Sequence, residues 1–279
     1  MIKRPPLYTL LFLIALFIHA HAHADISIVS ASCENKINPL GVEPDKLHFN
    51  WQLFSNETGN SQIAYQVVCA SSLANLQSGK YDVWNSGRVP DSRSLLVAYR
   101  GKKLNPGTVY YWQVRVWDRH NTNSAWSDQH HFTTGLFSPA DWDGARWIGY
   151  DIMPDSMRVV PGIHYPYADK LGDKAMLRPV VPLFRKTFQI NKKINRATVF
   201  VSGLGQYEMS INGKKVGNGF LTPGWTDYDK RCLYNTYDVT DLLGKDNNVL
   251  GVVVGNGFYN INRERYFKLT DAFGYPKLI

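Results

Sequence analysis

Cysteine is scarce in this chain of 279 residues, which contains only Cys33, Cys69 and Cys232. An odd number of cysteines without a CxxC spacing predicts neither a disulfide framework nor a zinc site. Cys69 lies in a strand-like run, so a buried thiol is the prediction at this position. A Cys33–Cys69 disulfide stays open as the alternative in an oxidising compartment.

Long apolar runs are missing too, apart from one near the N-terminus. That run covers Leu7–Ile18, follows the positively charged Lys3 and Arg4, and is too short to cross a bilayer stably. Alternating alanines after it provide the small-x-small pattern that a signal peptidase needs. We therefore predict a signal peptide over residues 1–24, cleavage before Asp25, and a periplasmic or secreted product without membrane contact. An uncleaved membrane anchor is the alternative.

Basic residues are in excess and give a formal net charge of +8, but they are scattered among acidic residues. They form no basic helix and no basic-aromatic stripe, which argues against nucleic-acid binding. The adjacent His130 and His131 point to opposite faces of a predicted strand and so do not share a metal ion easily. No loop has the clustered Asp and Asn residues of a calcium site. The sequence predicts no metal and no cofactor.

The clearest positive signal is a β-hairpin within residues 198–217. From Tyr207 to Ile211, apolar and polar residues alternate with the period of a half-buried strand. Asn212-Gly213 follows, the dipeptide that best supplies the two positive-φ positions of a type I′ turn. A return strand is expected to begin at Lys214.

Short strand patterns separated by turns fill residues 25–136. The strongest covers residues 109–118, where large apolar side chains occupy every second position. Strand aromatics at this period normally fill a sandwich interior, so we place Trp51, Tyr110 and Trp112 in the core rather than in a ligand groove. About seven strands at this spacing predict a two-sheet sandwich of the fibronectin type III or immunoglobulin kind.

A linker over residues 137–144 leads to a second β-rich region, residues 145–279. An irregular, proline-containing segment interrupts it at residues 151–182. The last four residues, Pro276–Ile279, look like the beginning of an apolar strand. We therefore expect an all-β chain: a fibronectin III/immunoglobulin-like sandwich followed by an incomplete jelly-roll-like β-sandwich, truncated at its C-terminus.

The motifs of both regions, taken in order, resemble the N-terminal portion of the bacterial family 78 glycoside hydrolases, the α-L-rhamnosidases. In the second region the resemblance is carried by Ala145–Gly149, Pro182–Lys186, Gly203–Gly217, Leu221–Tyr228, Tyr234–Thr240 and Gly255–Tyr259. In the first region it is carried by Asn38–Gly41, Ala64–Val67, Val83–Trp84 with Ser86–Gly87, Tyr110–Asp118 and Ser124–Ser127. Each motif is weak alone, but the ordered combination is specific.

The resemblance implies hydrolysis of terminal α-L-rhamnose by an inverting mechanism with two carboxylates. It also implies that those carboxylates lie in a helical (α/α)₆ barrel downstream of the β domains. This sequence contains no long segment of helical period, so no catalytic residue is carried over. Asp227 and Asp229 flank Tyr228 and are more simply explained as solvent-facing residues of a strand or turn. We expect these domains to be inactive alone.

Four aromatic residues of the second region are the candidate carbohydrate-binding residues: Trp225, Tyr228, Phe258 and Tyr259. A flat ring can stack on the C–H face of a rhamnose-containing glycoside or polysaccharide. The alternative is that these rings fill a core or pack against a catalytic barrel. For the chain as a whole, the leading hypothesis is an accessory part of an exported α-L-rhamnosidase. A stand-alone carbohydrate-binding or adhesion module and a ligand-free structural protein are the alternatives, and the sequence indicates no oligomeric state.

Overall fold

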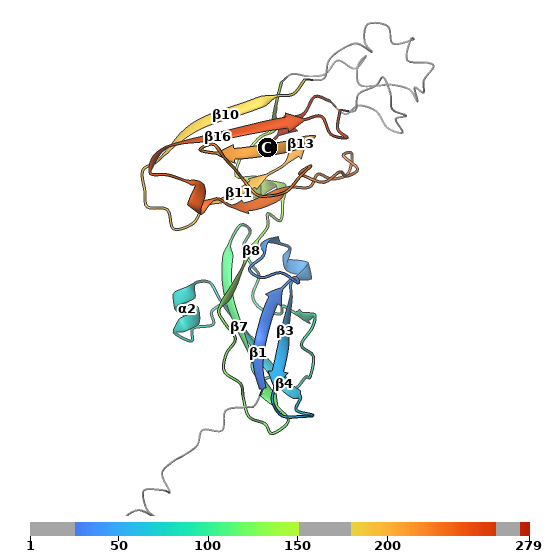
Figure 1. Ribbon diagram of the computed structural model, residues 1–279, viewed down its shortest axis with the longest axis vertical. Coiled ribbons are helices and arrows are strands. Elements are labelled where there is room, and N and C mark those ends of the chain that lie inside the picture. The colour runs from blue at the N-terminus through green and yellow to red at the C-terminus, as the bar shows by residue number, and fades with distance from the viewer. Residues whose placement is uncertain (1–25, 151–179, 261–273) are drawn as a thin grey trace, which may run out of the picture. The chain divides into compact units, whose positions relative to one another are not determined.

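The computed structural model describes residues 26–150, 180–260 and 274–279. The predicted signal peptide and most of the irregular segment at residues 151–182 lie outside these described residues. The chain divides into two compact units, unit 1 ending at Gly135 and unit 2 beginning at Leu136 (Figure 1). The described residues are almost entirely β-strands and loops, which confirms the predicted all-β class.

Within the described residues, unit 1 forms two sheets (Figure 1). The first sheet has the strand order β1 (Ile26–Cys33), β3 (His48–Ser55), β6 (Val97–Ala98). The second has the order β2 (Leu40–Val42), β8 (His130–Thr134), β7 (Val109–Asp118), β4 (Gln62–Ala70), β5 (Trp84–Asn85). Only β2 and β8 pair in parallel; the other described pairs of unit 1 are antiparallel. A 3₁₀ turn at Pro44–Lys46 (η1) precedes β3.

The core of unit 1 lies between these two sheets. Trp51, Tyr110 and Trp112 are each at most 4% exposed, so their predicted place in the core is confirmed. The Phe49 and Trp112 rings, one from each sheet, have centroids 4.5 Å apart. The indole N–H of Trp51 donates to Oε1 of buried Gln62 at 2.8 Å, which satisfies a polar group that would otherwise be costly to bury.

The outer face of β4 and β7 is covered as well. The five-residue helix α2 (Leu73–Gln77) packs Leu76 against Val68 and Ala70 of β4. Ser72 begins this helix by accepting a hydrogen bond from the N–H of Asn75 at 3.1 Å. The sequence pattern did not predict α2, because five residues are too few to show a helical period.

Further along this face, arginines and tryptophans alternate in a stack, which we call the Arg–Trp ladder. The Arg115 guanidinium lies 5.0 Å from the ring of Trp117 and 4.6 Å from the ring of Trp126, and Arg88 lies 5.3 Å from Trp117. Cation–π attraction of this kind holds the ladder against β7.

The segment that carries Trp126 is fixed to β7 by two serines. The buried hydroxyls of Ser124 and Ser127 each accept a hydrogen bond from a β7 amide, those of Val116 and Val114, both at 3.1 Å. The amides of the same serines donate back to the carbonyls of Val116 and Val114, both at 2.8 Å. Ser124 is therefore bonded to Val116, and Ser127 to Val114, through both backbone and side chain.

Two predicted elements of unit 1 differ from the structure. The sequence pattern over residues 94–99 predicts one strand, but only Val97 and Ala98 pair with β3. Leu96 has φ 53°, in the left-handed region, and this interrupts the extended run. The sequence also predicts a turn-like segment at Trp84–Gly87, but Trp84 and Asn85 form β5, which pairs with β4.

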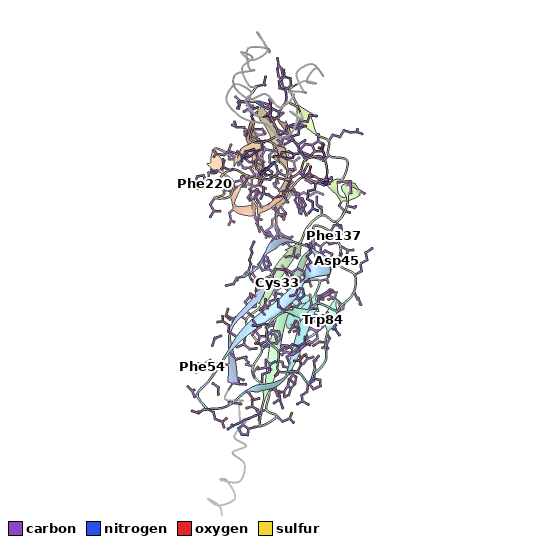
Figure 2. All side chains as sticks on the ribbon, turned by 90° about the vertical axis from the view of Figure 1, so that its right-hand side faces the viewer. Cys33, Asp45, Phe54, Trp84, Phe137 and Phe220 are labelled. Atoms are coloured by element: carbon purple, nitrogen blue, oxygen red, sulfur yellow. The ribbon has the colours of Figure 1, made fainter. Side chains whose placement is uncertain are left out.

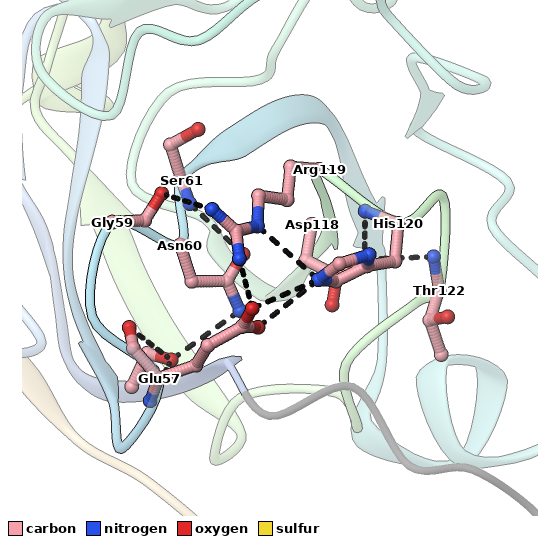
Figure 3. A network of polar contacts seen from close by, with 9 residues as sticks. Glu57, Gly59, Asn60, Ser61, Asp118, Arg119, His120 and Thr122 are labelled. Atoms are coloured by element: carbon pink, nitrogen blue, oxygen red, sulfur yellow. Dashed lines mark hydrogen bonds and ion pairs between the residues drawn. The ribbon is translucent and has the colours of Figure 1, made fainter.

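At one end of unit 1, a polar network joins the loop after β3 to the loop after β7 (Figure 3). The Glu57 carboxylate accepts hydrogen bonds from the Arg119 guanidinium and from Nε2 of His120, the latter at 3.1 Å. Hydrogen bonding to His120, followed by Arg119, holds the pKa of Glu57 below its ordinary value. Asp118 fixes the second loop by accepting from the amides of His120 and Thr122.

The two cysteines considered for a disulfide, Cys33 and Cys69, are free thiols buried in the same core cluster. Burial is the largest cause that raises the pKa of both thiols. Cys69 thus occupies the buried position that its strand pattern predicted.

Unit 2 contains three sheets within its described residues. The first has the order β10 (Leu183–Ile190), β16 (Asp246–Gly255), β13 (Gln206–Ile211), β14 (Lys214–Lys215). The second pairs β11 (Thr198–Val201) with β15 (Asn235–Asp238), and the third has the order β12 (Gly203–Leu204), β17 (Lys277–Leu278), β9 (Ile148–Gly149). Short 3₁₀ turns occur at Pro139–Trp142 (η2) and Thr240–Leu242 (η4).

The predicted hairpin of unit 2 is confirmed. β13 pairs antiparallel with β14, and the connecting Asn212 and Gly213 have φ 51° and 79°. On its other edge β13 pairs with β16 from Gln206 to Ile211. At the start of β13, Gly205 has φ 118°, and a Cβ atom there would lie 2.2 Å from the carbonyl oxygen of Gly255. Only glycine fits this position.

The core of unit 2 takes its side chains from all three sheets. Met209 and Ile211 of β13 and Val252 and Val254 of β16 lie in it, and none is more than 3% exposed. Leu278 of β17, 8% exposed, belongs to the same cluster. Among the helices that the structure describes, none is both long and apolar enough to cross a membrane.

Candidate functional site

The four candidate aromatic residues lie on two loops of unit 2 that meet. Trp225 and Tyr228 belong to the loop between β14 and β15, and Phe258 and Tyr259 belong to the turn after β16. The first loop is anchored at Thr222, whose carbonyl accepts from the Tyr207 amide at 2.7 Å and whose hydroxyl donates to the Tyr207 carbonyl at 3.1 Å.

The second loop is held by its own turn. The amides of Tyr259 and Asn260 both donate to the Asn256 carbonyl at 3.2 Å, and Gly257 has φ 48° in the left-handed region. Because Gly257 lies against the side chain of Gln206, the turn is fixed to the beginning of β13. Phe258 is thereby presented at the surface, while Tyr259 points inward.

The structure brings the four residues together as two pairs. The rings of Trp225 and Phe258 are stacked, with centroids 4.9 Å apart and an interplanar angle of 29°. The rings of Tyr228 and Tyr259 meet edge to face, with centroids 5.3 Å apart and an angle of 87°. Sequence spacing gave no reason for this pairing, since about 30 residues separate the members of each pair and strand pairing supplies the contact.

The two pairs differ in exposure. Trp225 is 67% and Phe258 49% exposed, whereas Tyr259 is 6% exposed and Tyr228 is half-buried. Burial raises the pKa of the Tyr228 hydroxyl. Tyr228 and Tyr259 therefore support the loops from beneath. Trp225 and Phe258 alone form an accessible surface, which we call the aromatic platform.

The loop between β14 and β15 exposes further apolar residues that the sequence pattern did not single out. Phe220 is 87%, Leu221 71% and Leu233 46% exposed. Figure 2 shows Phe220 at the outer margin of unit 2, and Lys215 lies 5.1 Å from its ring centroid. The loop has no periodicity, so composition alone did not distinguish these residues from core residues.

The carboxylates near the platform are engaged in local contacts. Oδ2 of Asp227 lies 2.8 Å from Nζ of Lys230, and this hydrogen bond holds the pKa of Asp227 below its ordinary value. Oδ1 of Asp227 also accepts from the amide of Asp229 at 3.3 Å, as expected for a turn. A general acid for glycoside hydrolysis requires a raised pKa. The pKa of Asp227 is lowered instead.

The same direction holds elsewhere in the described part of the chain. All described carboxyl groups with a shifted pKa are shifted downward: Glu57, Asp82, Asp91, Asp141 and Asp227. The described residues also contain no cluster of three or more His, Cys, Asp or Glu side chains arranged to hold a metal ion.

Comparison with known proteins gives family matches in both units. Residues 28–138 match the family described as "Rha78A-like, N-terminal immunoglobulin domain". Residues 192–278 match the family described as "Alpha-L-rhamnosidase N-terminal domain". The two matches occur in the order that the sequence motifs predicted.

Individual relatives agree with these matches. An alpha-L-rhamnosidase of Formosa agariphila is 38% identical over 233 residues, which are 81% of this chain and 24% of that protein. The structure of the alpha-L-rhamnosidase of Dictyoglumus thermophilum superposes with a TM-score of 0.72 at 37% identity, covering 91% of this chain and 27% of that one. The alpha-L-rhamnosidase of Aspergillus terreus gives a TM-score of 0.69 at 29% identity, covering 91% of this chain and 26% of that one.

This chain therefore spans about a quarter of the length of the relatives that it matches. With both units matched in order, the chain corresponds to the N-terminal region of alpha-L-rhamnosidases, an immunoglobulin domain followed by the alpha-L-rhamnosidase N-terminal domain.

Proposed function

We propose that this chain is the accessory N-terminal part of an exported α-L-rhamnosidase and that it contacts carbohydrate without cleaving it. The ordered match of both units to the N-terminal region of this family carries the proposal. Cleavage of terminal α-L-rhamnose would belong to the other three quarters of such an enzyme. The downward-shifted pKa of Asp227 beside the platform supports this division, because it disfavours the protonated form that a general acid needs.

Activity measurement tests the first half of the proposal. The purified chain, assayed with an aryl α-L-rhamnoside, is expected to release no nitrophenol above the rate without protein. Asp227→Asn should behave identically. Turnover that Asp227→Asn abolishes would overturn the proposed division between contact and catalysis.

The aromatic platform is the proposed place of carbohydrate contact. Trp225 and Phe258 are both exposed and stack on each other at an interplanar angle of 29°, which leaves an outer ring face for the apolar C–H face of a pyranose. Tyr228 and Tyr259 keep the two loops together below this surface. Asp227 and Lys230 lie close by on the same loop and provide polar groups beside the rings.

Affinity electrophoresis in a gel that contains a rhamnose-rich polysaccharide tests this contact. The unmodified chain should be retarded, and Trp225→Ala and Phe258→Ala should each lose most of the retardation. Phe54→Ala is the matched control, because Phe54 is also exposed, at 54%, but lies in unit 1. Equal retardation of all four proteins would contradict the assignment of the platform.

The same affinity electrophoresis also tests the alternative that the chain is a stand-alone carbohydrate-binding module. That alternative requires the chain to bind as tightly as a full-length relative does. If joining the chain to the remainder of a relative buries Trp225 and removes the retardation, the platform is a contact surface within the enzyme. Retardation that persists in the joined protein and is lost in Trp225→Ala and Phe258→Ala would instead favour a binding module.

A further inference from the structure

Unit 1 contains a cavity of about 380 Å³, a size within the range of ligand sites in proteins. It lies beside β5 and β6, two short strands of unit 1. Its walls include Tyr65, Trp84, Asn85, Arg93, Leu96 and Arg100. Figure 2 labels Trp84 in unit 1.

The charge of the cavity is positive. Of the described residues that line it, two are arginines and none is acidic. Nη2 of Arg93 lies 2.6 Å from Oδ2 of Asp91, so this charge is already compensated. The Arg100 guanidinium forms no hydrogen bond or ion pair with any residue that the structure describes. It is therefore available to an anion.

Tyr65 lines the same cavity. Tyr65 is 7% exposed, and its hydroxyl makes no hydrogen bond to the described residues. Burial raises the pKa of Tyr65, so the hydroxyl stays protonated and can donate. The hydroxyl oxygen is not among the fully buried polar atoms that lack a partner, so a ligand in the cavity can reach it.

The aromatic wall is held rigidly. Trp84 packs edge to face on Tyr99, with centroids 5.2 Å apart, and stacks on Phe49 at 5.8 Å. A Cβ atom on Gly101 would lie 2.6 Å from Cβ of Trp84, so only glycine lets the chain pass this close. Gly101 thereby brings its neighbour Arg100 to the Trp84 side of the cavity.

Backbone strain occurs on the rim. Leu96 has φ 53°, a conformation that bulky residues rarely adopt, and its side chain is 63% exposed. Its amide donates to Oδ1 of the buried Asn50 at 2.7 Å, which holds the strained conformation in place. Strain that the surroundings maintain is concentrated at ligand sites.

We propose that this cavity binds a saccharide unit that carries an anionic group, a carboxylate or a sulfate ester. Arg100 binds the anionic group; the Trp84 ring stacks on the sugar ring, and the Tyr65 hydroxyl donates to a sugar oxygen. The inference rests on the proposed function in taking a saccharide as the ligand. It is otherwise separate, because the platform lies in unit 2 and carries no arginine.

Calorimetry and NMR on the full chain, with three matched sugars, test the proposal. D-Glucuronate and D-glucose 6-sulfate should bind at least about tenfold more tightly than D-glucose, because each adds a charge-assisted hydrogen bond. Both should shift the Trp84 indole N–H resonance, and added salt should weaken both. The two charged sugars distinguish a carboxylate from a sulfate ligand.

Variants locate the site. Arg100→Gln should weaken the charged sugars at least about tenfold, and Tyr65→Phe should weaken all three sugars while the fold is unchanged. Lys36→Gln removes one exposed charge elsewhere in unit 1 and should change nothing. Equal affinity for D-glucose, an unchanged affinity in Arg100→Gln, or an unmoved Trp84 resonance would each overturn the proposal. Binding of inorganic sulfate as tight as that of the sugar sulfate would overturn the saccharide part.

Trp225→Ala separates this inference from the proposed function. It should leave binding of the charged sugars intact. If the charged sugars fail to bind while polysaccharide retardation still depends on Trp225, the cavity proposal alone is wrong. If the charged sugars bind through Arg100 while no variant affects retardation, the platform proposal alone is wrong.

Discussion

Phe49, in the first sheet of unit 1, packs against aromatic rings of the second sheet. It is fully buried, and its ring centroid lies 4.5 Å from that of Trp112 and 6.2 Å from that of Phe132. A side chain in such a position cannot be shortened without leaving a void, because neighbouring large rings relax only partly.

Phe49→Ala is therefore expected to lower the free energy of unfolding of unit 1 by about 3–5 kcal/mol. Urea titration followed by tryptophan fluorescence measures this change. Phe54→Ala, on the same strand but 54% exposed, should change it by no more than about 0.5 kcal/mol. Equal midpoints for the two variants would show that the ring cluster does not carry the stability of this unit.

At the residue scale, the sequence predicted side chains that obey the period of a strand. Trp51, Tyr110 and Trp112 were placed in the core on this ground, and they lie there. The cavity residues Trp84 and Arg100 were not found, since they stand in loops and short strands. Their approach depends on contacts with distant residues, which no local pattern encodes.

Among the elements of unit 2, the junction between β13 and β16 depends on one residue without a side chain. Gly205→Ala should destabilise this unit by about 2–4 kcal/mol, because the new methyl group would collide with the Gly255 carbonyl and φ would remain at 118°. Gly213→Asn is the matched control, since its φ of 79° is open to asparagine and nothing lies within 4 Å. Thermal melts of the two variants compare these effects. Similar melting temperatures would mean that the junction rearranges at little cost.

The loop network of Figure 3 makes the stability of unit 1 depend on pH. The pKa of Glu57 is lower in the folded protein than its ordinary value of 4.5, with hydrogen bonding to His120 as the largest cause. The charged carboxylate therefore stabilises the folded state above about pH 4.5, and this contribution is lost as the pH falls through the folded pKa.

Glu57→Gln should then be less stable than the unmodified chain at pH 7, with a difference that shrinks towards pH 3. Chemical denaturation at both pH values measures it. If Glu57→Gln lowers the free energy of unfolding equally at pH 7 and pH 3, the charge of the carboxylate is not the cause of the loss.

At the element scale, the hairpin at Asn212-Gly213 and the strands of 109–118 and 183–190 were predictable from alternation and turn chemistry. The helix Leu73–Gln77 and the break at Leu96 were not, because the helix is decided by packing and the break by the hydrogen bond that the Leu96 amide donates to Asn50. The pairing of Trp225 with Phe258 likewise follows from strand order, which a single sequence does not display.

For the whole chain, we propose export, directed by residues 1–24. Expression of the full sequence in a Gram-negative host should give a periplasmic protein whose first residue is Asp25. Leu13→Arg interrupts the apolar run and should leave the chain uncleaved in the cytoplasm. Recovery of the unmodified chain in the membrane fraction, with Met1 retained, would favour an anchor instead.

The serine hydroxyls that fix the Trp126 segment also affect how copies of this protein meet. The amides of Val114 and Val116 are satisfied by Ser127 and Ser124 and are not open for pairing. A neighbouring molecule therefore cannot extend the sheet along this part of β7, and edge-to-edge aggregation is blocked there. Loss of either hydroxyl would expose a strand amide and favour fibrous association at high concentration.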